Sequence, residues 1–187
     1  MSAAPPIRYP SRSSIVGEDT QIRRALPNRE RRMVGAWCFL DHLGPAQFAP
    51  GKGMHVGPHP HIGLQTFTWM IEGEVIHRDS LGYEQVIRPG QVNLMTAGRG
   101  ISHTEDSAQP GAVMHAAQLW IALPDAENNR EPAFQNYIDL PTADVGGWHA
   151  TVLAGSALGL TAPTLVYSPL VGVDFTASGA ANTTLAL

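Results

Sequence analysis

Short runs of alternating apolar and polar residues, separated by glycine and proline pairs, dominate the chain from residue 34 to residue 123. A period of two is typical of strands with one buried face, and turn residues at this spacing indicate a sandwich or a barrel. No long run has the helical period of 3.6 residues. The runs are AWCFLD, LQTFTWMI, EVIHRDS, EQVIRP and QVNLMTA, with a further strand at VMHAAQLWIAL, 113–123. This pattern predicts an all-β fold.

The composition fits a folded domain and excludes several classes of protein. With 187 residues, 43% of them apolar, the chain can bury roughly 70% of its unfolded surface. No apolar stretch approaches the roughly 18 residues of a membrane span, and the N-terminus has no apolar signal core. A net charge of -4 gives no general affinity for nucleic acid. The single cysteine, Cys38, excludes an intramolecular disulfide framework and fits a cytoplasmic location.

The chain divides into three parts. We expect residues 1–124 to form an N-terminal metal-binding barrel and residues 125–149, which are loop-like, to form a linker. Residues 150–187 resume short strands and are expected to form part of a second barrel; the runs are ATVLAGSALG, TLVYSPL, VGVDFTA and TTLAL. Four strands cannot close a barrel alone, and their unpaired edges favour a homo-oligomer.

Two pairs of side chains in the sequence are candidate metal ligands. His59 and His61 lie two residues apart, as do His103 and Glu105. In a strand, residues i and i+2 face the same side, and the glycine-rich turns between the pairs can fold the chain back on itself. Three nitrogens and one oxygen suit a borderline divalent metal, and Fe, Mn, Ni, Cu, Co and Zn all remain possible. Two open positions on an octahedral ion would remain for water, dioxygen or a chelating substrate.

Other residues near these pairs have competing interpretations. His77 is either an outer partner of a metal ligand or an exposed strand histidine paired with Asp79, and we favour the second. His115 is expected to be a buried, hydrogen-bonded histidine. The larger apolar side chains are expected to fill the core, with one or two of them forming a wall of an aromatic pocket; they are Phe67, Trp69, Met95 and Trp120.

These residues carry a family resemblance. The run from Gly53 to Glu105 resembles the two-motif signature of the cupin superfamily, in which a glycine, five residues and His59-x-His61 open the first motif. More narrowly, five segments resemble the pirin family: IRRALP at 22–27, VGAWCFLDHLGPA at 34–46, HPHIGLQTFTWMIEGEVIHRDS at 59–80, IRPGQVNLMTAGRGISHTE at 87–105 and QLWIALP at 118–124.

The resemblance implies a cupin barrel (a double-stranded β-helix, or jelly roll) followed by an incomplete second cupin barrel. It also implies one divalent metal ion, Fe(2+), in the N-terminal barrel, with the ligands His59, His61, His103 and Glu105. Two features depart from the family. Ile62-Gly63-Leu64-Gln65 stands where pirins usually carry Arg-Gly-x-Glu, and the chain ends partway through the second barrel.

The resemblance further implies a quercetin 2,3-dioxygenase-type activity on a flavonol, with Glu105 as metal ligand and catalytic base. The alternative is a non-catalytic iron-binding regulatory protein that binds a transcription factor or a metabolic enzyme through the arginine-rich segment 23–32. A third interpretation is a family member that has lost its activity. None of these hypotheses requires a membrane or direct binding to nucleic acid.

Overall fold

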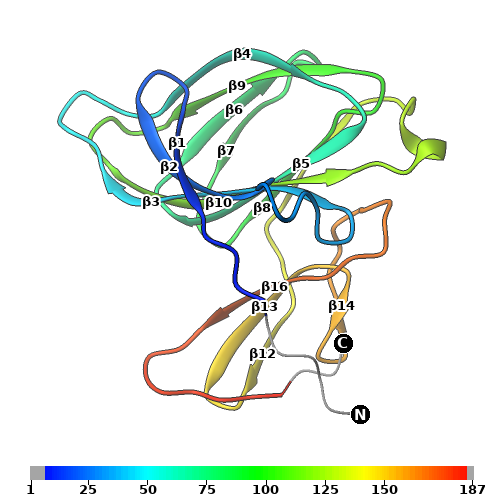
Figure 1. Ribbon diagram of the computed structural model, residues 1–187. Coiled ribbons are helices and arrows are strands. Elements are labelled where there is room, and N and C mark those ends of the chain that lie inside the picture. The colour runs from blue at the N-terminus through cyan, green and yellow to red at the C-terminus, as the bar shows by residue number, and fades with distance from the viewer. Residues whose placement is uncertain (1–6, 185–187) are drawn as a thin grey trace.

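The computed structural model describes residues 7–184, which form an all-β fold in two parts (Figure 1). The larger part contains a seven-stranded and a four-stranded sheet that face each other, and the smaller part contains a three-stranded sheet. All strand pairs are antiparallel. Among the described residues, no helix has the length and apolarity needed to cross a bilayer.

The strands of the larger part follow the runs expected from the sequence. In spatial order, the seven-stranded sheet contains β1 (Arg12–Val16), β2 (Thr20–Leu26), β3 (Trp37–Gln47), β10 (Val113–Ala122), β5 (Leu64–Glu72), β8 (Val92–Thr96) and β11 (Ala133–Tyr137). The four-stranded sheet contains β4 (His55–His61), β9 (Ile101–Ser107), β6 (Val75–Asp79) and β7 (Glu84–Ile87). The prediction of an all-β cupin-type fold is confirmed.

A hydrophobic core joins the two sheets. Its buried side chains come from both sheets and from the loops between them: Ile22, Leu43, Met54, Met70, Val75, Ile87, Met114 and Ala116. At roughly 25 cal/mol per Å² of apolar surface removed from water, each fully buried side chain of this size contributes on the order of 1.5–3 kcal/mol. Most of these side chains also line the cavity between the two sheets, in which the candidate site lies.

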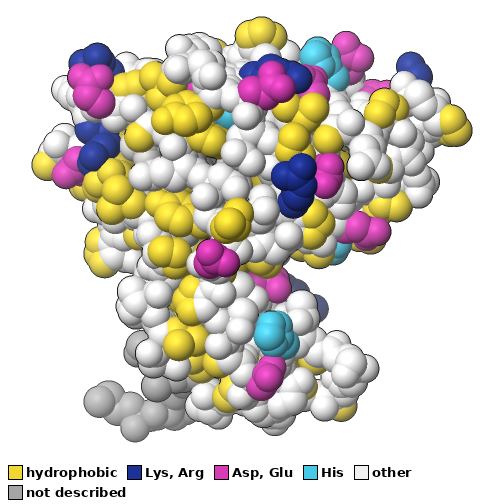
Figure 2. Space-filling model, turned by 180° about the vertical axis from the view of Figure 1, so that it is seen from behind, with side chains coloured by type: hydrophobic (Ala, Val, Ile, Leu, Met, Phe, Trp, Pro, Cys, Tyr) yellow, Lys and Arg dark blue, Asp and Glu magenta, His cyan; other side chains and the backbone are white. Residues whose placement is uncertain are grey.

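The smaller part covers the outer face of the seven-stranded sheet. Its sheet contains β12 (Thr142–Val145), β13 (Trp148–Ala154) and β16 (Gly172–Thr176), and β14 (Ser156–Ala157) pairs with β15 (Leu160–Thr161). Leu153 and Ala154 pack with Phe67 and Trp69 in a second core. Figure 2 shows apolar side chains gathered where the two parts meet. Strands β5 and β8 are therefore buried on both faces, and their runs LQTFTWMI and QVNLMTA are correspondingly rich in apolar residues.

The segment between residues 125 and 149 contains more structure than a loop. It begins with a 3-10 helix, η1 (Asp125–Glu127), and continues into β11, which pairs with β8, and β12, which pairs with β13. The sequence did not indicate β11, because its run AFQNY has little alternation and takes its register from β8. The proposed domain boundaries themselves stay a prediction.

The C-terminal runs follow the expectation in part. The first and third runs correspond to β13–β15 and β16, but residues 164–170 form no strand, so that expectation was wrong. Their polar groups make individual hydrogen bonds instead of a strand ladder. The Thr164 hydroxyl donates to the Leu153 carbonyl, and the Leu165 amide donates to the Tyr137 hydroxyl. Pro169 cannot donate to a sheet ladder. Part of the fourth run, 183–187, lies outside the described residues.

The turn that leads from β8 into β9 requires glycine at position 98. Gly98 has φ +51°, and a Cβ there would overlap the carbonyl oxygen of Arg130. The amide of Arg99 donates to the same carbonyl at 3.0 Å. The turn therefore packs directly on the segment after η1, and it fixes the start of the strand that carries His103.

We predict that Gly98→Ala destabilises the protein by more than Gly90→Ala. Gly90 also has a positive φ, +76°, but a Cβ there meets nothing within 4 Å. Gly90→Ala should therefore cost only the backbone strain, about 1–2 kcal/mol, and Gly98→Ala should add the steric overlap with Arg130. Urea unfolding measures the difference, and equal losses of stability in the two variants would contradict it.

Candidate metal centre

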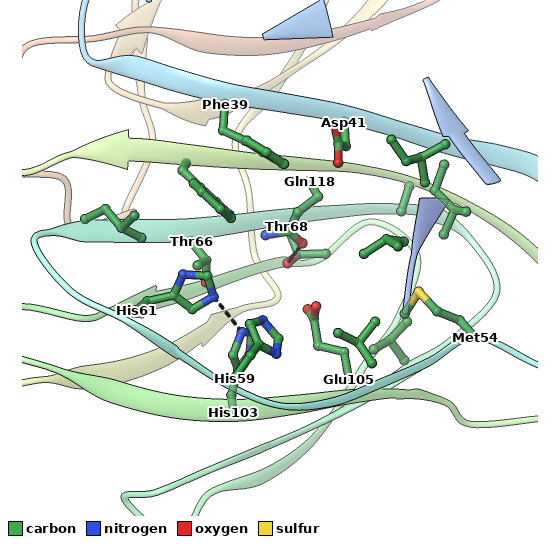
Figure 3. Close-up of a pocket in the computed structure, with 18 of the residues that line it drawn as sticks. Phe39, Asp41, Met54, His59, His61, Thr66, Thr68, His103, Glu105 and Gln118 are labelled. Carbon is green, nitrogen blue, oxygen red and sulfur yellow. Dashed lines mark hydrogen bonds between the residues drawn. The ribbon is translucent and has the colours of Figure 1, made fainter. Parts of the chain in front are cut away.

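The pairing of β4 with β9 brings the two histidine motifs together. His59 lies directly opposite His103 in the register, and His61 lies opposite Ile101. Because i and i+2 share a face, His59 and His61 both turn toward His103. The Nε2 atoms of His61 and His103 lie 3.0 Å apart, and the three imidazoles offer ligand atoms that all lie within 4.8 Å of one another. Figure 3 shows the three rings gathered at one end of a cavity.

Burial favours the neutral form of the imidazoles of His61 and His103. His61 and His103 are 8% and 3% exposed. Burial, and after it the charge of His59, lower the pKa of His61 to about 4. Burial is also the largest cause that lowers the pKa of His103 to about 2, followed by the charges of the neighbouring imidazoles. A neutral imidazole has a free lone pair, so both rings could bind a metal near pH 7 without first losing a proton.

Glu105 lies in the same cavity but outside the histidine cluster. Its carboxylate points into the cavity beside His59 (Figure 3), yet it is not part of the group within 4.8 Å. Beside this site the ladder has a bulge, in which the four residues Val56–His59 of β4 lie opposite the three residues His103–Glu105 of β9. Burial raises the pKa of Glu105 to about 7. The assignment of Glu105 as a fourth ligand and as a base stays a prediction.

The cavity between the two sheets has a volume of about 560 Å³, in the range that holds a drug-sized ligand. The histidines and Glu105 form one wall, and side chains of β3, β5 and β10 form the opposite wall (Figure 3). Most of the remaining lining is apolar: Val16, Ile22, Leu43, Met54, Val56, Leu64, Met70, Val75 and Ala116.

The opposite wall combines flat aromatic rings with fixed polar groups. Phe39 and Trp120 stack with their centroids 4.0 Å apart and an interplanar angle of 12°. The Arg24 guanidinium lies over Phe39 and donates two hydrogen bonds to the Asp41 carboxylate, at 2.7 and 2.6 Å. Trp120 thus belongs to the pocket wall, as the sequence allowed for one or two aromatic residues.

Beside the aromatic pair, the Thr68 hydroxyl donates to the side-chain oxygen of Gln118 at 2.7 Å. Since the amide oxygen of Gln118 is occupied in this way, its NH₂ group is available as a donor to a ligand in the cavity. The wall opposite the histidines therefore offers both a flat apolar surface and a polar contact.

His77 lies behind the histidine cluster. The sequence favoured an exposed histidine paired with Asp79, and the structure confirms the pairing but not the exposure. The Nε2 atom of His77 lies 3.0 Å from the Asp79 carboxylate, and the residue is 1% exposed. Its Nδ1 atom lies 3.2 Å from Nδ1 of His103. The sequence missed this arrangement, since the burial of β6 depends on strands far away in the chain.

Two further residues lie outside the candidate centre. His115 is partly buried on the outer face of the seven-stranded sheet. Its Nε2 atom lies 2.9 Å from Nε2 of His42. Gln65, which replaces the usual cupin glutamate, is fully buried and donates to the Thr96 hydroxyl and to the Leu165 carbonyl, at 2.9 and 3.0 Å. Its side chain therefore binds the smaller part of the molecule and does not line the cavity.

Comparison with known proteins agrees with the geometry. The family model described as Pirin matches residues 19–121. A Pseudomonas aeruginosa protein named "Putative quercetin 2,3-dioxygenase PA1205" is 56% identical over 180 residues, which is 96% of this chain and 57% of that protein. A pirin-like protein of Caulobacter vibrioides is 46% identical over 83% of this chain and 57% of its own length.

A solved structure shows the same fold. The crystal structure of a quercetin 2,3-dioxygenase from Acinetobacter baumannii superposes with a TM-score of 0.93 at 58% identity. The match covers 96% of this chain and 60% of that chain. The present chain thus spans less than two thirds of the length of these relatives.

We predict that His61→Ala loses most of the bound metal while the fold stays largely intact. Removal of one of three converging imidazoles should weaken metal binding at least tenfold, because loss of even an outer partner typically costs ten- to a hundredfold. Metal per chain, measured by mass spectrometry on untagged protein, tests this. His149→Ala, which removes a histidine paired with Asp144 in the smaller part, is the matched control. Equal metal contents in the two variants would exclude His61 as a ligand.

We predict that Glu105→Gln stabilises the metal-free protein at pH 8 and changes little at pH 5. The raised pKa of Glu105 means that the folded chain holds a proton that the unfolded chain loses between pH 4.5 and about 7. Stability therefore falls as the pH rises through this window, by on the order of 2–3 kcal/mol. Urea unfolding with a chelator at both pH values measures this, with exposed Glu72→Gln as control. An equal gain in stability at both pH values would contradict the idea that the parent chain has to ionise a buried Glu105 carboxyl group at pH 8.

Proposed function

The chain belongs to the pirin family, and from that premise we propose that it provides the metal-binding barrel of a dioxygenase that opens the central ring of a flavonol such as quercetin. The observation that carries the proposal is a 560 Å³ cavity with three clustered imidazoles on one wall and stacked aromatic rings on the other. The quercetin dioxygenase names of relatives at 56% and 58% identity support the same substrate class.

The donor set fits a divalent first-row metal. Imidazole nitrogens suit iron, zinc, copper and nickel, and a nearby carboxylate favours a harder ion such as iron(II) over copper. We propose Fe(2+), with His59, His61 and His103 as ligands and Glu105 as a fourth, which a rotation of its side chain would bring into reach. An iron ion held there would supply Lewis acidity toward the substrate oxygens and redox chemistry toward dioxygen.

Glu105 has the chemistry of a general base. Its carboxyl group points into the cavity, and its pKa of about 7 lies close to the pH at which a cell operates. When it is not bound to the metal, a base with such a pKa can take the proton of the flavonol 3-hydroxyl group and still be ionised in a large share of the molecules. In the overall reaction, flavonol and dioxygen give a ring-opened ester and carbon monoxide.

The opposite wall fits the body of such a substrate. The planar rings of a flavonol can pack on the Phe39–Trp120 pair, and the Gln118 amide can donate to one of its hydroxyl or carbonyl oxygens. The Arg24–Asp41 pair also belongs to this wall, and its two opposite charges are paired with each other through two hydrogen bonds. A cavity with these walls favours a flat, hydroxylated aromatic molecule over an aliphatic acid or a sugar.

The test is turnover by the chain itself. Protein stripped of metal is loaded with Fe(2+) without oxygen, mixed with quercetin and exposed to air, while flavonol absorbance and carbon monoxide are followed. We expect turnover in the parent chain and not in His61→Ala. Stoichiometric iron without turnover would reject the activity of this chain and favour the alternative of an iron-binding regulatory protein.

We predict that Gln118→Leu raises KM for quercetin about three- to tenfold, the effect of one lost hydrogen bond, and leaves the iron content unchanged. The unsubstituted 3-hydroxyflavone, which lacks the additional hydroxyl groups, serves as the control substrate and should lose less. Equal losses for both substrates would show that Gln118 does not recognise the additional hydroxyl groups of quercetin.

The finer expectations about location and partners remain proposals. A cytoplasmic location is supported by the single cysteine. Association between copies is supported by β12 and β16, which are the edge strands of the sheet in the smaller part.

A further inference from the structure

We propose that His77 and Asp79 are positioning residues that fix the tautomer of His103, so that its lone pair faces the cavity. This inference deepens the proposed function, because it concerns the same metal centre. It assigns a role to two buried residues that contact neither the substrate cavity nor the metal position. They act only through His103.

The direction of the hydrogen bonds follows from the carboxylate. An ionised Asp79 can only accept, so Nε2 of His77 must carry the hydrogen that spans the 3.0 Å to Oδ2. In a neutral ring, Nδ1 of His77 then has a lone pair. The 3.2 Å contact between the two Nδ1 atoms therefore requires the hydrogen to be on His103. This leaves Nε2 of His103, the atom on the cavity side, unprotonated.

The remaining contacts agree with this direction. Nε2 of His103 lies 3.0 Å from Nε2 of His61, and it accepts from that ring when no metal is bound. Burial lowers the pKa of His77, although the hydrogen bond to Asp79 opposes this effect, so a neutral His77 is consistent with its surroundings. The row Asp79–His77–His103–His61 is thus a single chain of hydrogen bonds with one direction.

The two outer residues are held in place from several sides. The second oxygen of Asp79 accepts the backbone amides of Leu81 and Tyr83, at 2.9 and 3.2 Å, in the turn between β6 and β7. The Asp79 side chain has no exposed surface. The His77 ring stacks on Phe134 of β11, with centroids 4.3 Å apart and an angle of 16°. Neither residue can turn away without losing a buried contact, as an orienting group requires.

His59 offers an internal comparison. Its Nδ1 donates to the carbonyl of Gly57 at 2.9 Å, which leaves Nε2 free in the same way. There the acceptor is a neutral carbonyl, whereas the acceptor behind His103 is a ring polarised by a carboxylate. Outer carboxylates raise the basicity of a ligating imidazole. His103 should consequently be the stronger donor of the two.

The structural alternative is that Asp79 serves only to close the β6–β7 turn. Asp79→Asn separates the two roles because it keeps the shape and the acceptor for Leu81 and Tyr83. Its NH₂ group would face Nε2 of His77 and force the hydrogen onto Nδ1. That hydrogen would point at Nδ1 of His103, so His103 would have to carry its own hydrogen on Nε2, where a metal would bind.

The first measurement is the tautomer itself, in metal-free protein. Long-range proton–nitrogen NMR spectra of ¹⁵N-histidine-labelled chain distinguish Nδ1–H from Nε2–H rings. We expect His103 to be the Nδ1–H form in the parent chain and the Nε2–H form in Asp79→Asn. An Nε2–H ring in the parent chain would overturn the proposal whether or not the site binds a metal, so this result is independent of the proposed function.

The second measurement uses Co(2+) alone, added to the stripped protein and followed by its visible absorption. We expect Asp79→Asn to bind Co(2+) roughly ten- to a hundredfold more weakly, with an altered spectrum. In a His77→Phe background, a phenyl ring takes the place of the imidazole and cannot make its hydrogen bonds. Asp79→Asn should change the Co(2+) affinity of that variant no further. A loss of thermal stability in both backgrounds, with unchanged Co(2+) affinity, would assign Asp79 to the turn alone.

Discussion

The antiparallel pairing of β4 with β9 is the interaction on which the rest of the site depends. It sets His59 opposite His103 and, through the two-residue period of a strand, turns His61 to the same side. Glu105 lies on the same strand as His103, two residues further along, and outside the group of three rings. The β4–β9 pair thus presents two neighbouring groups, a cluster of imidazoles and a separate carboxyl group in the same cavity.

Several of the polar groups in and around the cavity are stabilised by a partner of fixed direction. Arg24 binds Asp41 through two hydrogen bonds, Thr68 binds Gln118, and His77 spans Asp79 and His103. An isolated buried charge would be far more costly. Burial also favours the neutral forms of two other groups in the cavity, because it lowers the pKa of His61 and raises that of Glu105.

Segments after residue 124 contact the residues that surround the site on the side away from the cavity. The Arg130 carbonyl packs on the turn before β9, and Phe134 stacks on His77. The Leu165 carbonyl accepts from Gln65, so the residue that departs from the usual cupin glutamate is used to join the two parts of the molecule. The outer face of β5 and β8 is covered in the same way by β13 and its neighbours. The outer face of the seven-stranded sheet and the smaller part consequently share one core, separate from the core between the two sheets.

The sequence by itself determined the all-β fold, the main strands of the barrel and the facing of the histidine pairs, because a period of two is a local property of the backbone. It also showed the family, through motifs that surround these pairs. Only the tertiary structure decided the offset of Glu105, the burial of His77 with Asp79, the pairing of β11 and the irregular course of residues 164–170. Those features depend on register and burial between segments far apart in the chain, which no local pattern specifies.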